Sequence, residues 1–146
     1  LTPKLAALPG ITPVKTYPNV TRLSYYMYPF IYDEAEFQGL SRADFVKALS
    51  AEGIPASPGS PKYPIYTQEF IHEMFKTEVY KKFYSSKELD WEAYKARNEC
   101  PGLMKTFDTS VWLNTTGMLL GSKADMDDVV KAVEKIHKNA AKLKSA

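Results

Sequence analysis

The chain has 146 residues, of which 45% are hydrophobic and 25% are charged. Its 19 Lys and Arg residues exceed its 17 Asp and Glu residues by two, so the formal net charge is +2. This composition is that of an ordinary globular domain and excludes a disordered tail, a collagen-like chain and a disulfide scaffold. So small a charge gives little support for binding nucleic acid or an anionic membrane.

The N-terminus and the single cysteine bear on processing and location. The chain begins with Leu1 and not with Met, so we expect a processed protein or a piece of a longer one. Cys100 cannot form an internal disulfide, and we expect it to be a small buried hydrophobic residue. The sequence has no signal peptide and no apolar run long enough to span a bilayer. We therefore expect a cytoplasmic protein with no membrane partner.

Prolines dominate residues 1–21, where we expect a connector with little regular structure beyond a helix that ends at Pro9. Residues 22–32 give the strongest strand signal, because aromatic and β-branched residues dominate them. Alternation puts two sets of apolar side chains on opposite faces of that strand: Tyr26, Tyr28, Phe30 and Tyr32 on one, and Leu23, Tyr25, Met27 and Ile31 on the other. Pro29 removes a backbone donor and predicts a bulge or an edge position.

Two Ser-x-x-Asp caps predict the two clearest helices. Ser41 precedes a helix over 42–52, which Gly53 ends, and Ser122 precedes a helix over 124–143 with one apolar face. Further elements are predicted from shorter signals: strands over 54–57 and 111–114, a loop over 57–66 with three prolines and a glycine, and helices over 67–84 and 90–98. The fold class is therefore α+β, with a small, mainly antiparallel sheet packed with helices.

No constellation of residues predicts catalysis or a metal site. His72 and His137 have no His or Cys at helical spacing, so we predict no zinc ligands. The three aspartates over 125–128 lack the Gly and terminal Glu of an EF-hand loop, which favours helix capping over calcium binding. The lysines of the last helix are expected to form a solvated face, and Trp112 is expected in the core.

Short motifs follow one another along nearly the whole chain: Leu8-Pro9-Gly10-Ile11, Gly39 to Phe45 with Ala48 to Pro55, Tyr63-Pro64-Ile65-Tyr66, Cys100-Pro101, Val111-Trp112-Leu113, and Leu119-Leu120-Gly121 with Asp125 to Val129. In this order they resemble the C-terminal domain of the DegT/StrS family of PLP-dependent sugar and aminocyclitol aminotransferases. The resemblance implies the small-domain fold of fold-type I PLP enzymes, with residues 1–21 as an interdomain connector and 22–146 as the small domain. It also implies a further helix after Cys100-Pro101.

The resemblance implies a function that this chain would perform only in part. Family members transfer an amino group to a keto-sugar or keto-cyclitol and hold PLP (pyridoxal phosphate) on a lysine of a large N-terminal domain. Thr115-Thr116-Gly117 resembles the sequence that follows that lysine, but the nearest upstream lysine is Lys105, ten residues away, so we interpret the match as a coincidence. We therefore expect no catalytic and no cofactor-binding residue here, a large domain as the partner, an inactive chain when alone, and a homodimeric parent.

The small domain of such enzymes lines the substrate side of the cleft, which makes residues 57–66 the candidate loop. Hydroxyl groups there can bond to a polyhydroxylated ring. Relatives carry a histidine or a Gly-Tyr pair in this loop, whereas here Gly59 is followed by Ser60, so neither version is intact. The candidate substrate-binding residues are Ser57, Gly59, Ser60, Tyr63, Tyr66 and Asn114. Alternatively, Tyr63 and Tyr66 pack under the loop and stiffen it. A position facing the cleft is the alternative to the core position expected for Trp112.

Two other functions stay open. In the first, the chain is a stand-alone module, derived from that domain, that binds a small ligand or a protein without transaminase activity. The second is nucleic-acid binding, which rests only on the lysines of the last helix.

Overall fold

A computed structural model describes residues 1–59 and 63–144 of the chain. The chain divides into two compact units. We call Leu1–Gly59 with Thr109–Ala146 the sheet unit, and Ser60–Asp108 the helical unit. Each is described by itself.

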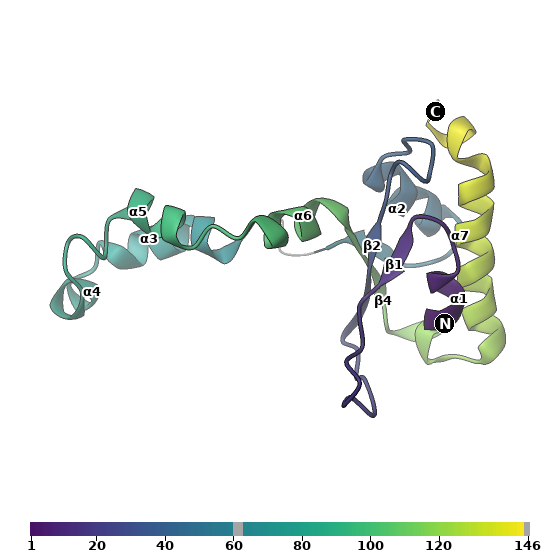
Figure 1. Cartoon of the computed structure of the whole chain (residues 1–146), viewed down its shortest axis with the longest axis horizontal. Helices are drawn as coiled ribbons and strands as arrows, with labels where there is room; N and C mark the ends of the chain where they lie inside the picture. The colour runs from purple at the N-terminus through teal and green to yellow at the C-terminus, as the bar shows by residue number, and fades with distance from the viewer. Residues whose placement is uncertain (60–62, 145–146) are drawn as a thin grey trace. The chain divides into compact units, whose positions relative to one another are not determined.

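The sheet unit contains four short strands and the longest helix of the described chain. Its elements are α1 (Thr2–Ala6), β1 (Ile11–Pro13), β2 (Met27–Tyr32), α2 (Arg42–Ala51), β3 (Ala56–Pro58), β4 (Ser110–Asn114), the 3-10 turn η2 (Gly117–Leu120) and α7 (Lys123–Leu143). The strands lie in the order β1-β2-β4-β3, and every neighbouring pair is antiparallel. Helices α1, α2 and α7 lie together on one side of the sheet (Figure 1). The predicted α+β class with a mainly antiparallel sheet is confirmed.

The register between β2 and β4 decides which side chains face the helices. Tyr28 lies opposite Leu113 and Phe30 lies opposite Val111, and all four are buried. Successive residues of a strand point to opposite faces, so these pairs form the inner face of the sheet. The alternate residues of β2 are only half-buried. The predicted alternation along β2 is thus confirmed, with one face buried and the other partly exposed.

The rings of Phe30, Tyr32, Phe37 and Phe45 form the centre of the core beneath the sheet. Tyr32 stacks on Phe45 of α2 with ring centroids 4.3 Å apart, and Phe37 packs edge-on against Phe45 at 5.1 Å. The Tyr32 hydroxyl donates a 2.8 Å hydrogen bond to the Leu40 carbonyl, so its polar end is satisfied although the residue is buried. This burial raises the pKa of Tyr32 above its ordinary value.

The two predicted helix caps are present, and both helices contribute to the core. The Ser41 Oγ accepts from the Asp44 N–H at 3.1 Å, and the helix is followed by Gly53 at φ +81°. Helix α7 buries one stripe of small and branched residues: Val129, Ala132, Val133, Ile136 and Ala140. Its predicted apolar face is therefore largely confirmed.

The expectation for residues 1–21 is wrong in part. Leu5 of α1 is fully buried, and β1 pairs with β2 through residues such as Ile11 opposite Tyr32. The prolines of this segment argued against a strand in the sequence analysis. Pro13 is nevertheless compatible with β1, because it is the last residue of the strand, where a missing backbone donor costs little. β1 reaches only as far as Phe30, so Pro29 has a paired neighbour on the β4 side alone. The predicted edge position is thus found locally, and the register with β4 runs through it without a bulge.

The strand predicted to begin near residue 22 begins at Met27. β4 ends at Asn114, which lies opposite Met27, so the pairing stops there. Tyr26 is consequently 89% exposed and does not share the buried face of Tyr28. The strand predicted over 54–57 lies slightly later, at Ala56–Pro58.

The helical unit consists of short helices held by aromatic contacts. Its elements are the 3-10 turn η1 (Ile65–Thr67), α3 (Glu69–Phe75), α4 (Glu78–Phe83), α5 (Trp91–Arg97) and α6 (Pro101–Thr109). No large hydrophobic side chain among its described residues is fully buried. The unit instead packs rings, with Trp91 stacked between His72 at 4.8 Å and Tyr94 at 5.7 Å.

Three expectations for this unit are settled by the structure. The single helix predicted over 67–84 is interrupted between α3 and α4, where the Thr77 hydroxyl bonds to the Met74 carbonyl at 2.7 Å and competes with the helix. Asp90 caps α5 as predicted, accepting from the Ala93 N–H at 2.7 Å. Cys100 is exposed, so its predicted burial is wrong. The unit is too open to enclose it.

Among the described residues, no helix combines the length and the apolar character that crossing a bilayer requires.

Removing the Tyr32 hydroxyl tests the aromatic core. Tyr32→Phe leaves the buried Leu40 carbonyl without its partner, so we expect the free energy of unfolding to fall by about 1–3 kcal/mol in urea. Tyr26→Phe is the matched control, because Tyr26 is exposed, and it should change stability by less than about 0.5 kcal/mol. Equal effects of the two variants would contradict the assigned hydrogen bond.

Candidate functional site

The outer face of the sheet, opposite the helices, brings together three of the predicted site residues. Ser57 lies opposite Trp112, and Asn114 follows two residues later on the same face of β4. Gly59 continues the line of Ser57 beyond the end of β3, and its N–H donates to the Ser110 carbonyl at 3.1 Å. Ser57 and Trp112 are half-buried. This face therefore offers one flat ring with polar groups around it.

Trp112 is the residue that the sequence analysis misplaced. It is half-buried on the outer face and does not belong to the core cluster, so the expectation of a core tryptophan is wrong. The alternation within β4 carried the signal, because Val111 and Leu113 are both fully buried and Trp112 stands between them. Its indole N–H is a hydrogen-bond donor only.

Gly59 is required by close packing. A Cβ at this position would lie 1.9 Å from the Ser110 Oγ and 3.2 Å from the Trp112 Nε1. The Ser110 carbonyl also accepts from the Arg42 guanidinium at 3.1 Å. Two donors thus hold one carbonyl and fix the point where the candidate loop leaves the sheet. Because Gly59 has no side chain, its backbone can lie this close to Ser110 and Trp112.

The Asn114 side chain is engaged in a local turn. Its Oδ1 accepts from the Thr116 N–H at 3.0 Å and from the Thr116 hydroxyl at 2.8 Å. This geometry stabilises the chain after β4. Asn114 therefore lies on the predicted face, with its oxygen committed to the turn.

The remaining candidates lie outside the sheet unit. Tyr63 and Tyr66 belong to the helical unit, where Tyr63 is 56% exposed and Tyr66 is half-buried. Ser60 lies outside the described residues. The six candidates are thus divided between two units, and their joint role in one loop stays a prediction.

One grouping of possible metal ligands occurs among the described residues, on α3. Ligand atoms of Glu69, His72 and Glu73 all lie within 4.8 Å of one another. The sequence analysis considered only His and Cys as partners of His72, so it did not identify Glu69 and Glu73 as further possible ligands. Each residue already has a partner, since His72 contacts Glu69 at 3.2 Å and Glu73 pairs with Lys76, which lowers the pKa of Glu73. Surface ion pairing accounts for the cluster.

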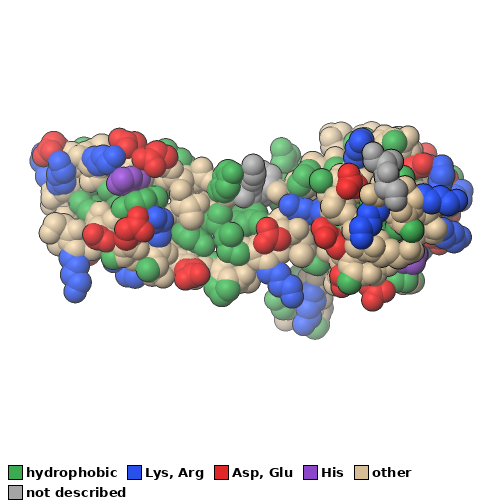
Figure 2. All heavy atoms as spheres, turned by 90° about the horizontal axis from the view of Figure 1, so that it is seen from above, with side chains coloured by type: hydrophobic (Ala, Val, Ile, Leu, Met, Phe, Trp, Pro, Cys, Tyr) green, Lys and Arg blue, Asp and Glu red, His purple; other side chains and the backbone are tan. Residues whose placement is uncertain are grey.

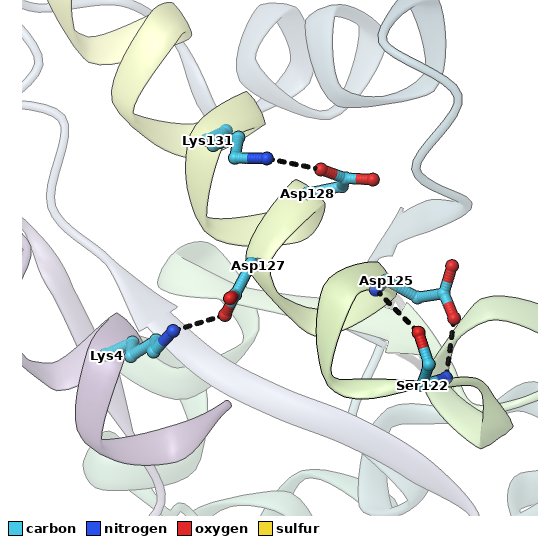
Figure 3. Close-up of polar contacts among 6 residues, drawn as sticks. All are labelled: Lys4, Ser122, Asp125, Asp127, Asp128 and Lys131. Carbon is cyan, nitrogen blue, oxygen red and sulfur yellow. Dashed lines mark hydrogen bonds and ion pairs between the residues drawn. The ribbon is translucent and has the colours of Figure 1, made fainter.

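Of the three aspartates at the start of α7, Asp125 acts as a cap, as the sequence predicted, whereas Asp127 and Asp128 form ion pairs that the sequence analysis did not predict (Figure 3). The Ser122 Oγ accepts from the Asp125 N–H at 3.4 Å, and the Asp125 carboxylate accepts from the Ser122 N–H at 2.5 Å. Hydrogen bonding of the Asp125 carboxylate with the Ser122 side chain and with the Ser122 backbone N–H lowers the pKa of Asp125. Asp127 pairs with Lys4 of α1, and Asp128 pairs with Lys131. Their side chains point to different partners and do not converge on one ion.

The lysines in the described part of the chain are all exposed or half-buried. A lysine that forms a Schiff base needs an enclosed setting that lowers its pKa, and no lysine in the described part of the chain is buried. Lys87 lines a cavity but is exposed. The pKa values of Lys76 and Lys131 are raised by their carboxylate partners Glu73 and Asp128, which is the opposite of activation.

Comparison with known proteins identifies relatives of this chain. The chain is 29% identical over 153 aligned residues to a protein of Streptomyces kanamyceticus named as an L-glutamine:3-amino-2,3-dideoxy-scyllo-inosose aminotransferase. Proteins with the same name from Streptoalloteichus tenebrarius and Micromonospora echinospora are each 26% identical, over 147 and 156 residues. These alignments cover 99–100% of this chain. No family model matches it.

The resemblance inferred from the motifs is confirmed: the chain is similar along its whole length to aminotransferases named for an aminocyclitol ketone. The chain spans about a third of the length of these relatives, 34% in each case.

The close approach at Gly59 gives a direct test of the site's architecture. Gly59→Ala places a methyl group against Ser110, and we expect it to destabilise the sheet unit by about 1–3 kcal/mol in urea unfolding. Ser110→Ala removes the nearest atom, so the double variant should lose less than the sum of the two single losses. Gly102→Ala is the control, because a Cβ there meets nothing within 4 Å. A Gly59→Ala protein as stable as the Gly102→Ala protein would refute the packing described.

The capping box can be tested against calcium binding. Ser122→Ala should cost about 1 kcal/mol of stability through the lost cap, while Ser50→Ala in the last turn of α2 should cost less. Added calcium chloride should leave the thermal midpoint of the unaltered chain unchanged. A calcium-dependent rise of several degrees, lost in Asp125→Asn, would favour the metal alternative.

Proposed function

We propose that this chain forms the small-domain part of a PLP-dependent aminotransferase of the DegT/StrS family, acting on a keto-cyclitol or keto-sugar. The observation that carries the proposal is the whole-length similarity to relatives of that name, each about three times as long as the matched region. PLP would supply the transamination chemistry from a site in another part of the enzyme, a proposal supported by the exposed or half-buried state of the described lysines.

The chain's own contribution is to bind and orient the substrate. Ser57 and Trp112 lie opposite each other on the outer face of the sheet and carry a hydroxyl group and an indole N–H, which are groups able to bond to a polyhydroxylated ring. Gly59 keeps that surface free of a side chain next to the Trp112 Nε1. A ring lying there would be held by groups mounted on strands, which position contacts more rigidly than a loop does.

A stand-alone binding module is the second candidate. The half-buried outer face and the partly exposed apolar residues of the helical unit favour it, since both offer surface for a partner. It differs from the first candidate in one respect: the module would bind its ligand with no contribution from a PLP-binding domain. For the first candidate, the aminotransferase, we also propose a homodimeric parent enzyme and a cytoplasmic location.

A chimaera tests the proposed function. The third of the Streptomyces kanamyceticus relative that aligns with this chain is replaced by the chain, and two properties are measured. We expect an absorbance band of protein-bound PLP and glutamine-dependent amination of 3-amino-2,3-dideoxy-scyllo-inosose. In the chimaera, Trp112→Phe should raise KM roughly 2- to 10-fold with a smaller change in kcat, as expected for one lost hydrogen bond.

The absorbance band separates misfolding from lost function. A chimaera that holds PLP yet aminates neither this ketone nor other keto-cyclitols or keto-sugars would count against the proposal. So would a saturable, lysine-dependent PLP band in the isolated chain. Ser50→Ala, remote from the outer face, is the control and should leave KM unchanged.

A further inference from the structure

The helical unit contains a cavity that the aminotransferase proposal does not use. Its volume is about 560 Å³, within the range of pockets that bind small molecules. Phe75 of α3, Tyr80 of α4 and Tyr94 of α5 contribute rings to its wall, together with Tyr84 just after α4. Ile71 and Leu89 add aliphatic surface. The cavity is thus predominantly aromatic and apolar.

The rings of the wall hold one another in place. Phe75 meets Tyr94 edge-on at 4.9 Å, and Tyr80 stacks on Tyr84 at 5.7 Å. Trp91 stacks on Tyr94 and contacts Phe75, so it supports both rings while itself lying outside the lining. Rings fixed by their neighbours cost little further entropy when a flat ligand packs against them.

Charge complementarity identifies the kind of ligand. Lys87 and Arg97 line the cavity with one carboxylate, that of Glu88, so the lining carries a net charge of about +1. The Glu88 carboxylate accepts from the N–H and the hydroxyl of Ser85, at 2.8 and 2.7 Å. The Arg97 guanidinium donates to the Glu88 backbone carbonyl at 3.1 Å. That bond uses one of five N–H groups and anchors the cation at the cavity.

We propose that this cavity binds a small planar aromatic anion, an aryl carboxylate or aryl sulfonate, with its ring against Phe75 and Tyr94 and its charge at Arg97 and Lys87. The ligand differs in chemistry from an aminocyclitol, which is neither aromatic nor anionic. The proposal therefore stands or falls independently of the aminotransferase assignment.

A protein segment is the competing occupant. Hydrophobic side chains reach the surface in the helical unit, interleaved with charged ones (Figure 2), and Val79 and Phe83 of α4 are 63% and 75% exposed. A second copy of the chain would cover such surface in proportion to protein concentration. A small ligand would bind independently of it.

The test uses 1-anilinonaphthalene-8-sulfonate, an aromatic anion whose fluorescence rises in apolar sites. We expect saturable binding of one molecule per chain, with energy transfer from Trp91, which contacts the ring of Tyr94 in the cavity wall. Trp91→Phe should therefore reduce the transfer. Arg97→Gln should weaken binding about 10-fold or more, as expected for a lost charge-assisted contact.

Matched variants and a neutral probe make the result decisive. Lys82→Gln removes an exposed charge of α4 that does not line the cavity, and it should leave affinity unchanged. Arg97→Lys should retain part of the affinity for the sulfonate. Circular dichroism shows whether Arg97→Gln disturbs the fold. If it does, Lys87→Gln still tests the charge contribution and should lower the affinity. N-phenyl-1-naphthylamine, which lacks the sulfonate, should bind more weakly and respond to none of the charge variants.

Three results would overturn the proposal. One is equal affinity of the sulfonate for the Lys87→Gln and Lys82→Gln proteins. Another is binding of the neutral probe as tight as that of the anion. The third is loss of the sulfonate signal as protein concentration rises, with self-association measured by sedimentation, which would assign the cavity to a second copy of the chain.

Discussion

The pairing register of β2 with β4 is the constraint on which the sheet unit depends. It sets Phe30 opposite Val111 and Tyr28 opposite Leu113, and so delivers one continuous apolar face to α2 and α7. Because the side-chain period of a strand is two, a slip of one residue would turn that face outward. The same register fixes Trp112 and Asn114 on the other face. Core and candidate site are two consequences of one alignment.

Gly59 links this register to the candidate loop. Its backbone lies so close to Ser110 that a methyl group would not fit. The Gly59 N–H and the Arg42 guanidinium both donate to the Ser110 carbonyl. Arg42 is the first residue of α2, whose cap Ser41 was evident in the sequence. A helix start, a strand end and a glycine therefore meet at one carbonyl. This convergence gives the loop a fixed origin beside the Trp112 indole.

Sequence alone sufficed where a local physical rule acted by itself. The caps at Ser41, Asp90 and Ser122 each follow from a side chain bonding to a nearby N–H. It failed where a distant partner decided the outcome. Strand β1 forms because it pairs with β2. The residues before Met27 form no strand, despite their strand-like sequence, because β4 ends opposite Met27. Trp112 was misplaced because residue type outweighed alternation.

The two units differ in what stabilises them, and this bears on how each serves a function. The sheet unit buries a contiguous core from α1 to α7, so its outer face is a rigid platform for polar contacts. The helical unit relies on ring contacts such as Trp91 with Tyr94, without a fully buried large hydrophobic side chain among its described residues. A unit of this kind opens locally at lower free energy, and whatever occupies its aromatic cavity stabilises the folded state by mass action. The proposed platform is thus built into the fold, whereas a ligand bound in the aromatic cavity would add stability to the helical unit.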